Sequence, residues 1–529
     1  MNLINEVNNL LHLHDVTWVN NRGHVETHLD KLETVLLCCK ENLGFHWISD
    51  IIGNDVDEDN YSLKYLLKNP EEGNSLVVTC LFNKTITVKS IAPLWRHAVE
   101  FEKEIHEMLG VKFDFYIPRY LFSEKFKGFP LLKNFKDFEV DESVEPKEFG
   151  SFIVSPRFPL NEQDIKIHLD LNNDKVSLCD IEMGFHHFGF EKNAEGKSVD
   201  QILNSIGILS SKTSAMWTMS WAHLVEQGLN ISIPDKAMGI RMILNELTRV
   251  KDHLYTLILI SYQCGYEDFV SSLTIWYRKT LEQITLLTNN KNSSFHITIG
   301  GVRSDIPSGW ISNCLEFLGS LEKELLTEYK FLTKSSFWYD RLQCGTIERK
   351  KAMEWGITGP ALRACGVNYD LRKRDPIYFY KDVSFEIPLG INGHIYDRFL
   401  VLVEEVFQSL KIISQVLENI PTGNIISEDI NSFYNINKNS DEFDESKYKS
   451  SIYSKYNVDF SNSWSEWESS GGVCHINASF DQDIVTRLKV TSPGQKLMGL
   501  FTHEVINEKL EDVELFWLSL GVKMSEVEK

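Results

Sequence analysis

The sequence lacks the short motifs that most readily identify enzyme sites. It contains no G-x-G-x-x-G stretch, no glycine-rich loop ending in Lys-Ser or Lys-Thr, and no H-E-x-x-H. These absences argue against the usual dinucleotide, phosphate-loop and zinc-protease sites. The nine cysteines form no C-x-x-C pair and no disulfide-type spacing. Their odd number and scattered positions predict reduced, mostly buried thiols.

Long apolar runs and an excess of basic residues are also missing. The longest apolar run, around residues 254–261, is far shorter than the roughly 20 residues of a membrane-spanning helix. The N-terminus shows no signal-peptide pattern. The 54 Lys and Arg are outnumbered by 75 Asp and Glu, which argues against nucleic acid as a partner. We therefore expect a soluble chain that reaches a membrane only through other subunits.

The composition that is present suits a globular protein of more than one domain. The chain has 529 residues, of which 43% are hydrophobic, enough for a large core. The acidic run from Asp141 to Glu148, interrupted by Pro146, predicts an exposed linker. We therefore expect a small α+β domain over residues 1–140, an acidic linker over 141–150, and a larger domain over 151–529.

Local patterns predict the main elements of both domains. In the first, we expect a helix ending at Gly44, a hairpin turning at Asn83-Lys84, and a helix closed by Gly110. In the second, strands turn at residues 172–174 and long helices dominate from about 198 to 410. The polar stretch 435–470 predicts a surface insertion, and a strand and a helix follow from residue 487.

One part of the first domain resembles the 30 kDa subunit of respiratory complex I. The matching stretches are WRHAVEFEKEIHEMLGVKF, with Trp95, Glu102-Lys103-Glu104 and Gly110-Val111, and FPLLKNF from Phe129. Lys103 and Leu132 stand where that family usually has arginine.

The larger domain resembles the 49 kDa subunit of complex I and the large subunit of group 4 nickel-iron hydrogenases. Five stretches match in family order, so a free-standing protein of another class would require five coincidences. The matches are GFHHFGFEK at 184–192, IRMILNELTRVKDHL at 240–254, IGGVRSDIPSG at 299–309, TGPALRACGVNYDLRK at 358–373 and DRFLVLVEEVFQS at 397–409.

The resemblance implies a fused chain of α+β class. We expect the small domain to be followed by a strand-rich cap and a long-helix bundle of the nickel-iron hydrogenase large-subunit type. The implied partners are an iron–sulfur cluster subunit and the membrane-arm subunits. The implied location is peripheral, on the cytoplasmic side of the inner (plasma) membrane.

The hydrogenases hold nickel and iron with four cysteines, because soft thiolates suit such metals. In this chain the four ligand positions look like Ser210, Thr213, Lys523 and Glu526. We therefore expect no nickel and no metal held by these residues. The ending SEVEK resembles that of the complex I subunit more than that of a hydrogenase.

The complex I subunit uses this emptied cavity for a quinone head group, which needs proton donors on its carbonyl oxygens. The family's histidine position looks like Phe158, its tyrosine Ser211, its aspartate Gln263, and an arginine beside the last cluster looks like Phe188. These four changes suggest a degraded pocket. A quinone-reducing subunit with divergent pocket residues is the alternative.

Some polar residues leave two interpretations open. His187 and His223, and His186 beside them, are weak candidates for proton transfer, although a helix end and a core position explain His187 and His223 as well. Arg363, Asp370, Arg372 and Lys373 fit either a surface for an acidic partner or an ordinary ion-pair network. With these residues we expect an iron–sulfur cluster in the partner subunit, possible quinone binding, and no cofactor assigned to this chain.

Overall fold

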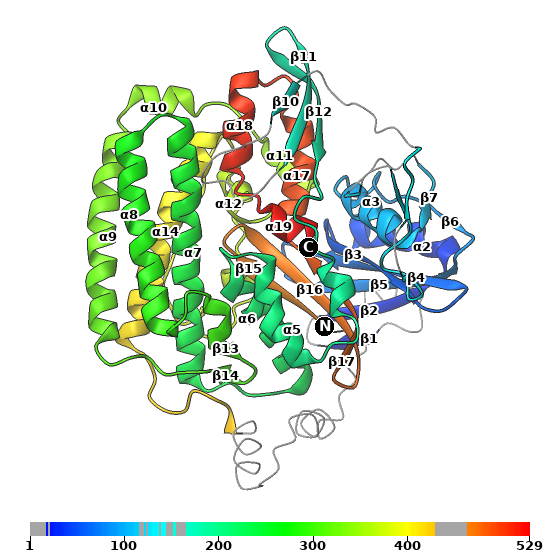
Figure 1. Ribbon diagram of the computed structural model, residues 1–529, viewed down its shortest axis with the longest axis horizontal. Coiled ribbons are helices and arrows are strands. Elements are labelled where there is room, and N and C mark those ends of the chain that lie inside the picture. Colours follow the sequence, from blue (N-terminus) through cyan, green and yellow to red (C-terminus); the bar gives the residue numbers. More distant parts are fainter. Residues whose placement is uncertain are drawn as a thin grey trace.

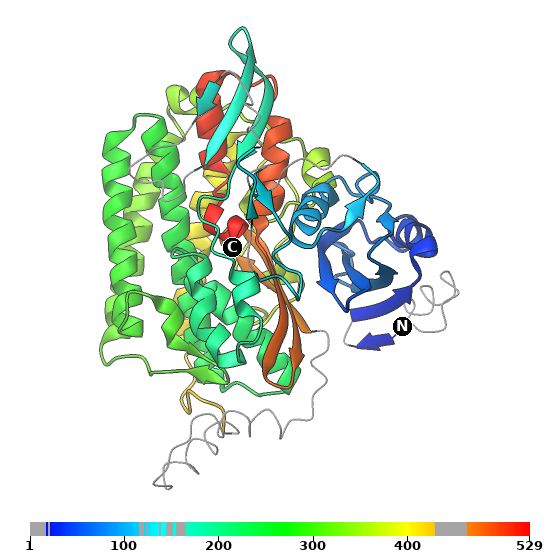
Figure 2. The same cartoon turned by 45° about the vertical axis from the view of Figure 1, so that its right-hand side comes forward.

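A computed structural model describes residues 17–19, 22–115, 121–122, 125–136, 139–143, 152–154, 165–428 and 463–529. A bundle of long helices stands on one side, the N-terminal sheet on the other, and a three-stranded sheet with the C-terminal helices between them (Figures 1 and 2). The fold is mixed α+β, as the sequence predicted. Phe158 and linker residues 144–150 lie outside the described residues.

The N-terminal region is built on a five-stranded sheet of order β1-β2-β5-β4-β3. Helix α3 (Ala98–Leu109) ends, as predicted, at Gly110, whose φ of 81° is the left-handed conformation that glycine adopts readily. The predicted hairpin at Asn83-Lys84 is wrong, because β5 is flanked on both edges by β2 and β4. The other bounds are β1 (Thr17–Val19), β2 (Arg22–Thr27), α2 (Leu29–Asn42), β3 (Trp47–Asp55), β4 (Asn60–Lys68), β5 (Ser75–Asn83), β6 (Thr87–Val88), β7 (Lys112–Phe113), β8 (Phe126–Lys127) and β9 (Glu139–Val140).

A strand-rich cap follows and rises above the body of the molecule (Figure 1). Strand β11 (Lys166–Asn172) pairs with β10 (Phe152–Val154) and with β12 (Lys175–Glu182). The turn between β11 and β12 lies where it was predicted, with Asn173 at a φ of 61°. Three short elements then lead into the bundle: α4 (Phe190–Ala194), α5 (Val199–Ser205) and the 3-10 helix η1 (Ile206–Leu209).

Helix α7 (Asp235–Gln263) is the central helix of the bundle. Its buried residues lie on every side, because it packs against both α14 (Ile395–Glu418) and α8 (Glu267–Thr288). The remaining elements of this part are α6 (Ser214–Leu229), η2 (Ser293–His296), β13 (Ile297–Thr298), β14 (Gly301–Val302), α9 (Trp310–Leu332), α10 (Ser336–Arg341), α11 (Arg349–Glu354), α12 (Gly359–Ala364) and α13 (Leu371–Arg374).

The sheet β15-β16-β17 joins the two sides of the molecule. Strand β15 (Ser463–Ser469) packs on α6, while β17 (Ile484–Thr491) contacts α4 and β3. The prediction of a surface insertion is therefore wrong for residues 463–470, since Trp467 and Glu468 are buried. The rest of that predicted insertion lies outside the described residues. The chain continues through β16 (Gly472–Asp481), α17 (Pro493–Glu504), α18 (Leu510–Ser519) and α19 (Met524–Glu528).

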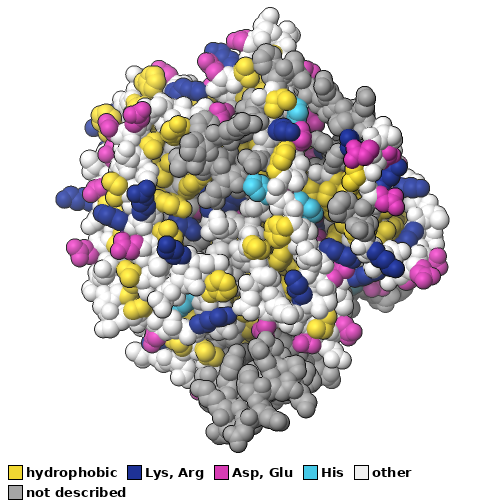
Figure 3. All heavy atoms as spheres, in the orientation of Figure 1, with side chains coloured by type: hydrophobic (Ala, Val, Ile, Leu, Met, Phe, Trp, Pro, Cys, Tyr) yellow, Lys and Arg dark blue, Asp and Glu magenta, His cyan; other side chains and the backbone are white. Residues whose placement is uncertain are grey.

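The face shown in Figure 3 has no large area of one charge or of hydrophobic side chains. On the face seen in Figure 3, basic and acidic side chains alternate and hydrophobic ones lie in small groups among them. Among the described residues, no helix combines the length and apolar composition that crossing a membrane requires.

Candidate functional site

The four positions of the expected metal ligands meet at the short helix α19. Ser210 and Thr213 lie in the turn between η1 and α6, and Lys523 and Glu526 come from the beginning of α19. All four side chains are buried. The hydroxyl of Thr213 donates to Glu526 Oε1 at 2.5 Å, and the Thr213 amide donates to Ser210 Oγ at 3.4 Å. The structure thus brings the two sequence-distant pairs together.

A salt bridge lies beside these four positions and includes one of them, Lys523. Lys523 Nζ lies 2.8 Å from Asp252 Oδ2 of α7, and Ser470 Oγ donates to the same oxygen at 2.5 Å. Burial disfavours the charged form of Asp252, but Lys523 and Ser470 outweigh it and hold its pKa at about 2. We call Ser210, Thr213, Asp252, Ser470, Lys523 and Glu526 the cavity cluster.

Within the same cluster, the pKa of Glu526 is shifted in the opposite direction to that of Asp252. Burial raises the pKa of its carboxyl, and Lys523 and the Thr213 hydroxyl offset only part of that effect. The pKa of Lys523 is raised, because Asp252 and Glu526 outweigh the burial of its ammonium group. The cavity cluster therefore holds a fixed ion pair beside a carboxyl that binds a proton more tightly than usual.

These residues do not fit a nickel-iron centre. Such a centre needs soft thiolate donors, whereas the cluster offers hydroxyls, two carboxyls and an ammonium group. Lys523 is a cation already paired with Asp252, and the Glu526 carboxyl accepts from Thr213. Within the described part of the chain, no three His, Cys, Asp or Glu side chains are grouped so as to hold a metal ion.

A pocket opens directly beside the cavity cluster and shares two of its residues, Asp252 and Lys523. One wall is α7, the opposite wall is the end of α18 with the turn into α19, and Lys212 borders it from the turn before α6. Lys212 Nζ lies 3.2 Å from the centre of the Tyr255 ring. We call this the α7–α18 pocket; it is lined by Lys212, Asp252, Tyr255, Thr256, Leu259, Trp517, Leu518, Gly521, Val522 and Lys523.

The positions that resemble the family's quinone contacts lie elsewhere. Ser211 is exposed, and Gln263 donates to Glu514 Oε2 at 3.0 Å at the end of α7. Neither lines the α7–α18 pocket. Phe188 is partly exposed, with its ring centre 6.0 Å from that of Phe190.

The structure does not bring the two candidate histidines together. His187 lies between the cap and the N-terminal region, where its Nδ1 is 2.5 Å from the Glu528 carbonyl oxygen. His223 lies on α6 against the rings of Tyr378 and Trp467, with centres 6.4 Å and 6.0 Å away. The two line different pockets, and neither lines the α7–α18 pocket. The main chain of His186 donates to Glu528 Oε2 at 2.5 Å.

The far end of α19 belongs to a second group of buried charges, at the contact with the N-terminal region. Lys529 Nζ lies 3.2 Å from Glu104 Oε1 and 3.1 Å from Glu191 Oε1. Lys489 Nζ lies 2.5 Å from the same oxygen of Glu104. Burial opposes the charge of Glu191, but Lys529 and Lys489 outweigh it and lower its pKa. Glu104 of the E-K-E triplet therefore joins the two parts of the chain.

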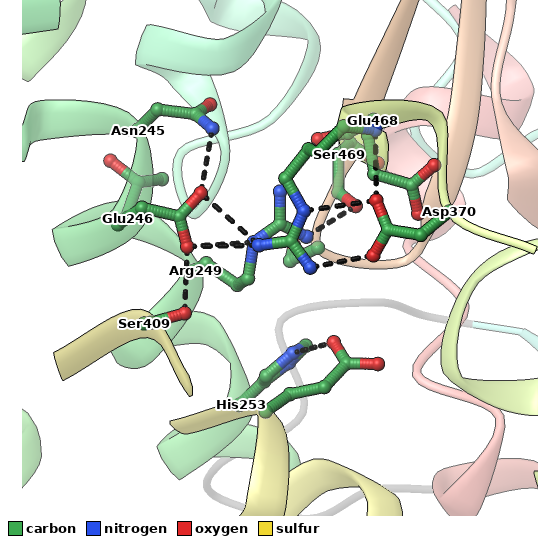
Figure 4. Close-up of polar contacts among 12 residues, drawn as sticks. Asn245, Glu246, Arg249, His253, Asp370, Ser409, Glu468 and Ser469 are labelled. Atoms are coloured by element: carbon green, nitrogen blue, oxygen red, sulfur yellow. Dashed lines mark hydrogen bonds and ion pairs between the residues drawn. The ribbon is translucent and has the colours of Figure 1, made fainter. Parts of the chain in front are cut away.

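A third group of charges lies inside the bundle (Figure 4). Arg363 donates to Glu405 Oε1 at 2.6 Å and to Glu468 Oε1 at 3.0 Å. Arg372 donates to Asp370 Oδ2 at 2.7 Å and to Glu246 Oε2 at 3.0 Å. For Arg363, Asp370 and Arg372 the ion-pair interpretation is confirmed. Lys373 is exposed, with its ammonium 3.9 Å from the centre of the Phe385 ring.

Sequence reasoning missed the residues that complete the site. Asp252, Tyr255 and Ser470 lie far from the ligand positions in sequence, and contact with them arises only through the fold. Helix α7 is buried on all sides, so its hydrophobic pattern does not reveal which face borders a pocket. Asp252 is not singled out by its charge either, because α7 also buries Glu246 and Arg249.

Comparisons with known proteins agree with this architecture. A family described as "Respiratory-chain NADH dehydrogenase, 30 Kd subunit" matches residues 25–140. A second, described as "Respiratory-chain NADH dehydrogenase, 49 Kd subunit", matches residues 277–529.

Similar curated proteins join the same two parts in one chain. The C/D-type NADH-quinone oxidoreductase protein of Bdellovibrio bacteriovorus is 28% identical over 433 residues, which cover 77% of this chain and 76% of that protein. The protein of the same name from Photorhabdus laumondii is 29% identical, over 69% of this chain and 66% of its own length, slightly under two thirds. The chain belongs to the respiratory complex I family, as a fused subunit of the C/D type.

Proposed function

We propose that this chain is a peripheral-arm subunit of a membrane-bound, complex I-like oxidoreductase. It docks an iron–sulfur cluster subunit onto the membrane arm, on the cytoplasmic side of the membrane. It holds no nickel-iron centre, and its quinone pocket has lost the family's usual contacts. The cavity cluster carries this proposal, because Lys523, at one of the positions that resemble the hydrogenase ligands, is a cation paired with Asp252.

The proposal also assigns the two parts of the chain. Residues 1–140 are a 30 kDa-type domain, 141–150 a linker, and 151–529 a domain related to the 49 kDa subunit and to hydrogenase large subunits. The buried pairs from Lys489 to Glu104 and from Lys68 to Glu466, the latter at 2.6 Å, support a fixed arrangement of the two domains. A docking subunit needs such rigidity to hold its partners in one geometry.

A second candidate is a working quinone-reducing subunit with divergent pocket residues. One observation favours it: the α7–α18 pocket adjoins the cavity cluster and is lined by the hydrogen-bond donors Lys212 and Tyr255 as well as by apolar side chains. His187 and His223 do not line this pocket, so they are poor donors for a quinone bound there.

Purification of the native assembly through a tag on this chain tests both candidates. Co-purification of an iron–sulfur subunit and membrane-arm subunits, with iron but no nickel by mass spectrometry, is the expected result. Quinone reduction blocked by a site-directed inhibitor favours the second candidate over the first. Recovery of the chain without such subunits, or with stoichiometric nickel, contradicts the proposal.

A further inference from the structure

We propose that Asn392 is a site of spontaneous modification, at which its side-chain amide is lost and an aspartate or an isoaspartate linkage takes its place. Asn392 is followed by Gly393 in the turn of residues 390–394 that leads into helix α14. We call these residues the Asn392 turn. The inference goes beyond the proposed function and does not depend on it, because it concerns the chemistry of one turn of the chain.

The reaction joins Asn392 to the residue that follows it. The main-chain nitrogen of Gly393 attacks the side-chain Cγ of Asn392, and a new C–N bond forms. The amide nitrogen of Asn392 leaves as ammonia with the proton of the Gly393 N–H. One water molecule then opens the five-membered succinimide at either of its carbonyls, which gives aspartate or isoaspartate. The reaction needs no oxidant and no further reactant, and this lability makes asparagine a thermolabile residue.

Both reacting groups of the Asn392 turn are free. Asn392 is exposed, and Ile391 beside it is 85% exposed, so water reaches the turn. Within the described part of the chain, no hydrogen bond or ion pair holds the Asn392 side chain or the Gly393 N–H. By contrast, the amides of Ile391 and His394 donate to the two carboxylate oxygens of Asp397, at 2.9 Å and 3.1 Å. The turn is thus fixed on both sides of a pair that has no competing bond.

The fold requires glycine at position 393 and so retains the reactive pair. Gly393 has a φ of 71°, in the left-handed region that glycine adopts readily. A Cβ atom there would lie 2.1 Å from the main-chain oxygen of Ile347 and 3.2 Å from Cys365 Sγ. Without a side chain, glycine also leaves its nitrogen unshielded. Gly393 is buried, but the attack occurs within the chain and water needs to reach only the exposed Asn392.

The isoaspartate product should disturb the start of α14. Gly393 O accepts from the Ile347 amide at 3.0 Å and from Arg398 Nη1 at 3.0 Å. Arg398 is buried, and its other donors bond Gly345 O and Ser519 Oγ, at 2.7 Å and 2.9 Å. These acceptors are all neutral, so each of them matters to the buried guanidinium. Isoaspartate adds one carbon to the main chain directly before Gly393 and would move its carbonyl group away from Arg398.

The aspartate product should be tolerated. It keeps the length of the main chain, so Gly393 O stays in place. Its carboxylate lies just before His394, the N-cap of α14, where the partial positive charge of a helix N-terminus favours an anion. Repulsion from Asp397 in the first turn offsets part of this gain. We therefore expect the isoaspartate product, rather than the aspartate product, to reduce stability.

Ageing of the purified chain in water enriched in heavy oxygen tests the site. Modification during the incubation then carries the heavy isotope, so peptide mass spectrometry separates it from earlier modification. Asn74 and Asn292 are the controls, because each precedes a serine and is held, Asn74 by Glu72 at 2.9 Å and Asn292 by the Ser294 amide at 3.2 Å. We expect residue 392 to react about tenfold faster than either. Equal rates at the three positions, or no reaction at residue 392, overturn the inference.

Two substitutions separate the reaction from its consequence. Asn392→Gln keeps an amide but would have to close a six-membered ring, so it should stop the modification. Asn392→Asp reproduces the aspartate product and should unfold at the same temperature as the fresh natural chain. The aged natural chain should unfold at a lower temperature, in proportion to its isoaspartate content, and protein isoaspartyl methyltransferase with its methyl donor should restore it. An equal loss in aged Asn392→Gln, or a loss that the methyltransferase does not reverse, overturns the assigned consequence.

Discussion

Two sets of buried charges lie along helix α7, and their carboxylates differ in the number of partners. Glu246, in the middle of the helix, accepts hydrogen bonds from Arg249, Arg372, Tyr380, Ser409 and Asn245. Asp252, less than two turns further on, is bonded by Lys523 and Ser470. The first set belongs to the interior of the bundle and the second to the cavity cluster.

The difference separates a structural network from a candidate site. In the bundle, burial opposes the charge of Glu246 and Glu405, but arginines outweigh it and lower the pKa of both. In the cavity cluster, burial raises the pKa of Glu526. The direction of the pKa shift does not by itself separate the two sets, because burial also raises the pKa of Glu468 in the bundle. The number of partners does, and fully paired carboxylates mainly fix the fold.

The largest loss of stability is expected when the arginine that bonds two carboxylates of the bundle is removed. Arg363→Met leaves Glu405 and Glu468 buried without their shared cation. The free energy of unfolding should fall by about 3–5 kcal/mol, measured by urea denaturation followed through tryptophan fluorescence. Arg374→Met, at an exposed position, is the control and should change it by less than about 0.5 kcal/mol. Equal stability of the two variants would mean that the bundle network contributes little.

Removing the cation of the cavity cluster should reduce stability less than removing Arg363. Lys523→Met removes the cation that is paired with Asp252, and we expect a loss of about 2–3 kcal/mol by the same measurement. The double variant with Asp252→Asn should lose less than Lys523→Met alone, because no unpaired charge then remains buried. A double variant less stable than both single variants would show that the pair is not the unit that stabilises this cluster.

A pair of hydroxyl deletions compares the two sets at the level of single hydrogen bonds. Ser470→Ala leaves Asp252 its ion pair with Lys523, and the free energy of unfolding should fall by about 1–2 kcal/mol. Ser409→Ala leaves Glu246 with its arginines, Tyr380 and Asn245, and should cost about 0.5–1 kcal/mol. The reverse order would contradict the idea that the number of partners sets the cost.

The smallest expected effect is a change in how stability depends on pH. The raised pKa of Glu526 means that the folded state keeps this proton longer than the unfolded chain, so its contribution to stability falls as pH rises above the ordinary value of 4.5. Glu526→Gln should therefore gain stability relative to the natural chain as pH increases from about 4.5. Glu405→Gln should instead lose stability relative to the natural chain as pH rises toward about 4.5 and should change little above it, because the folded pKa of Glu405 is lowered. Parallel pH profiles for the two variants would contradict the comparison.

The sequence predicted the framework better than the site. Periodicity and glycine positions located the helices that end near Gly44 and Gly110 and the turn at Asn173. The hairpin after Asn83 was wrong, because local alternation does not reveal that β5 is a central strand with both edges paired. Residues 463–470 were mistaken for surface because polar residues alternate with tryptophans. Ser465 and Glu468 are nevertheless buried and bonded, Ser465 to Ser220 and Glu468 to Arg363.

The candidate site was harder to predict than the fold, because its contacts join elements that are distant in the sequence. A resemblance placed Ser210, Thr213, Lys523 and Glu526 in one group, and the structure brings them together. The partner that balances Lys523 could not be read from any spacing, since Asp252 belongs to another element. Tyr255 is similarly hidden on a helix whose hydrophobic pattern has no free face.

The contact between Lys489 and Glu104 has a consequence for the order in which the chain acquires its structure. The two residues are 385 positions apart, so their bond closes a very long loop. During synthesis the N-terminal sheet emerges hundreds of residues before the cation that binds its Glu104, and contacts of such separation form slowly. The N-terminal domain should therefore fold early but stay undocked, with Glu104 still hydrated, until strand β17 has left the ribosome.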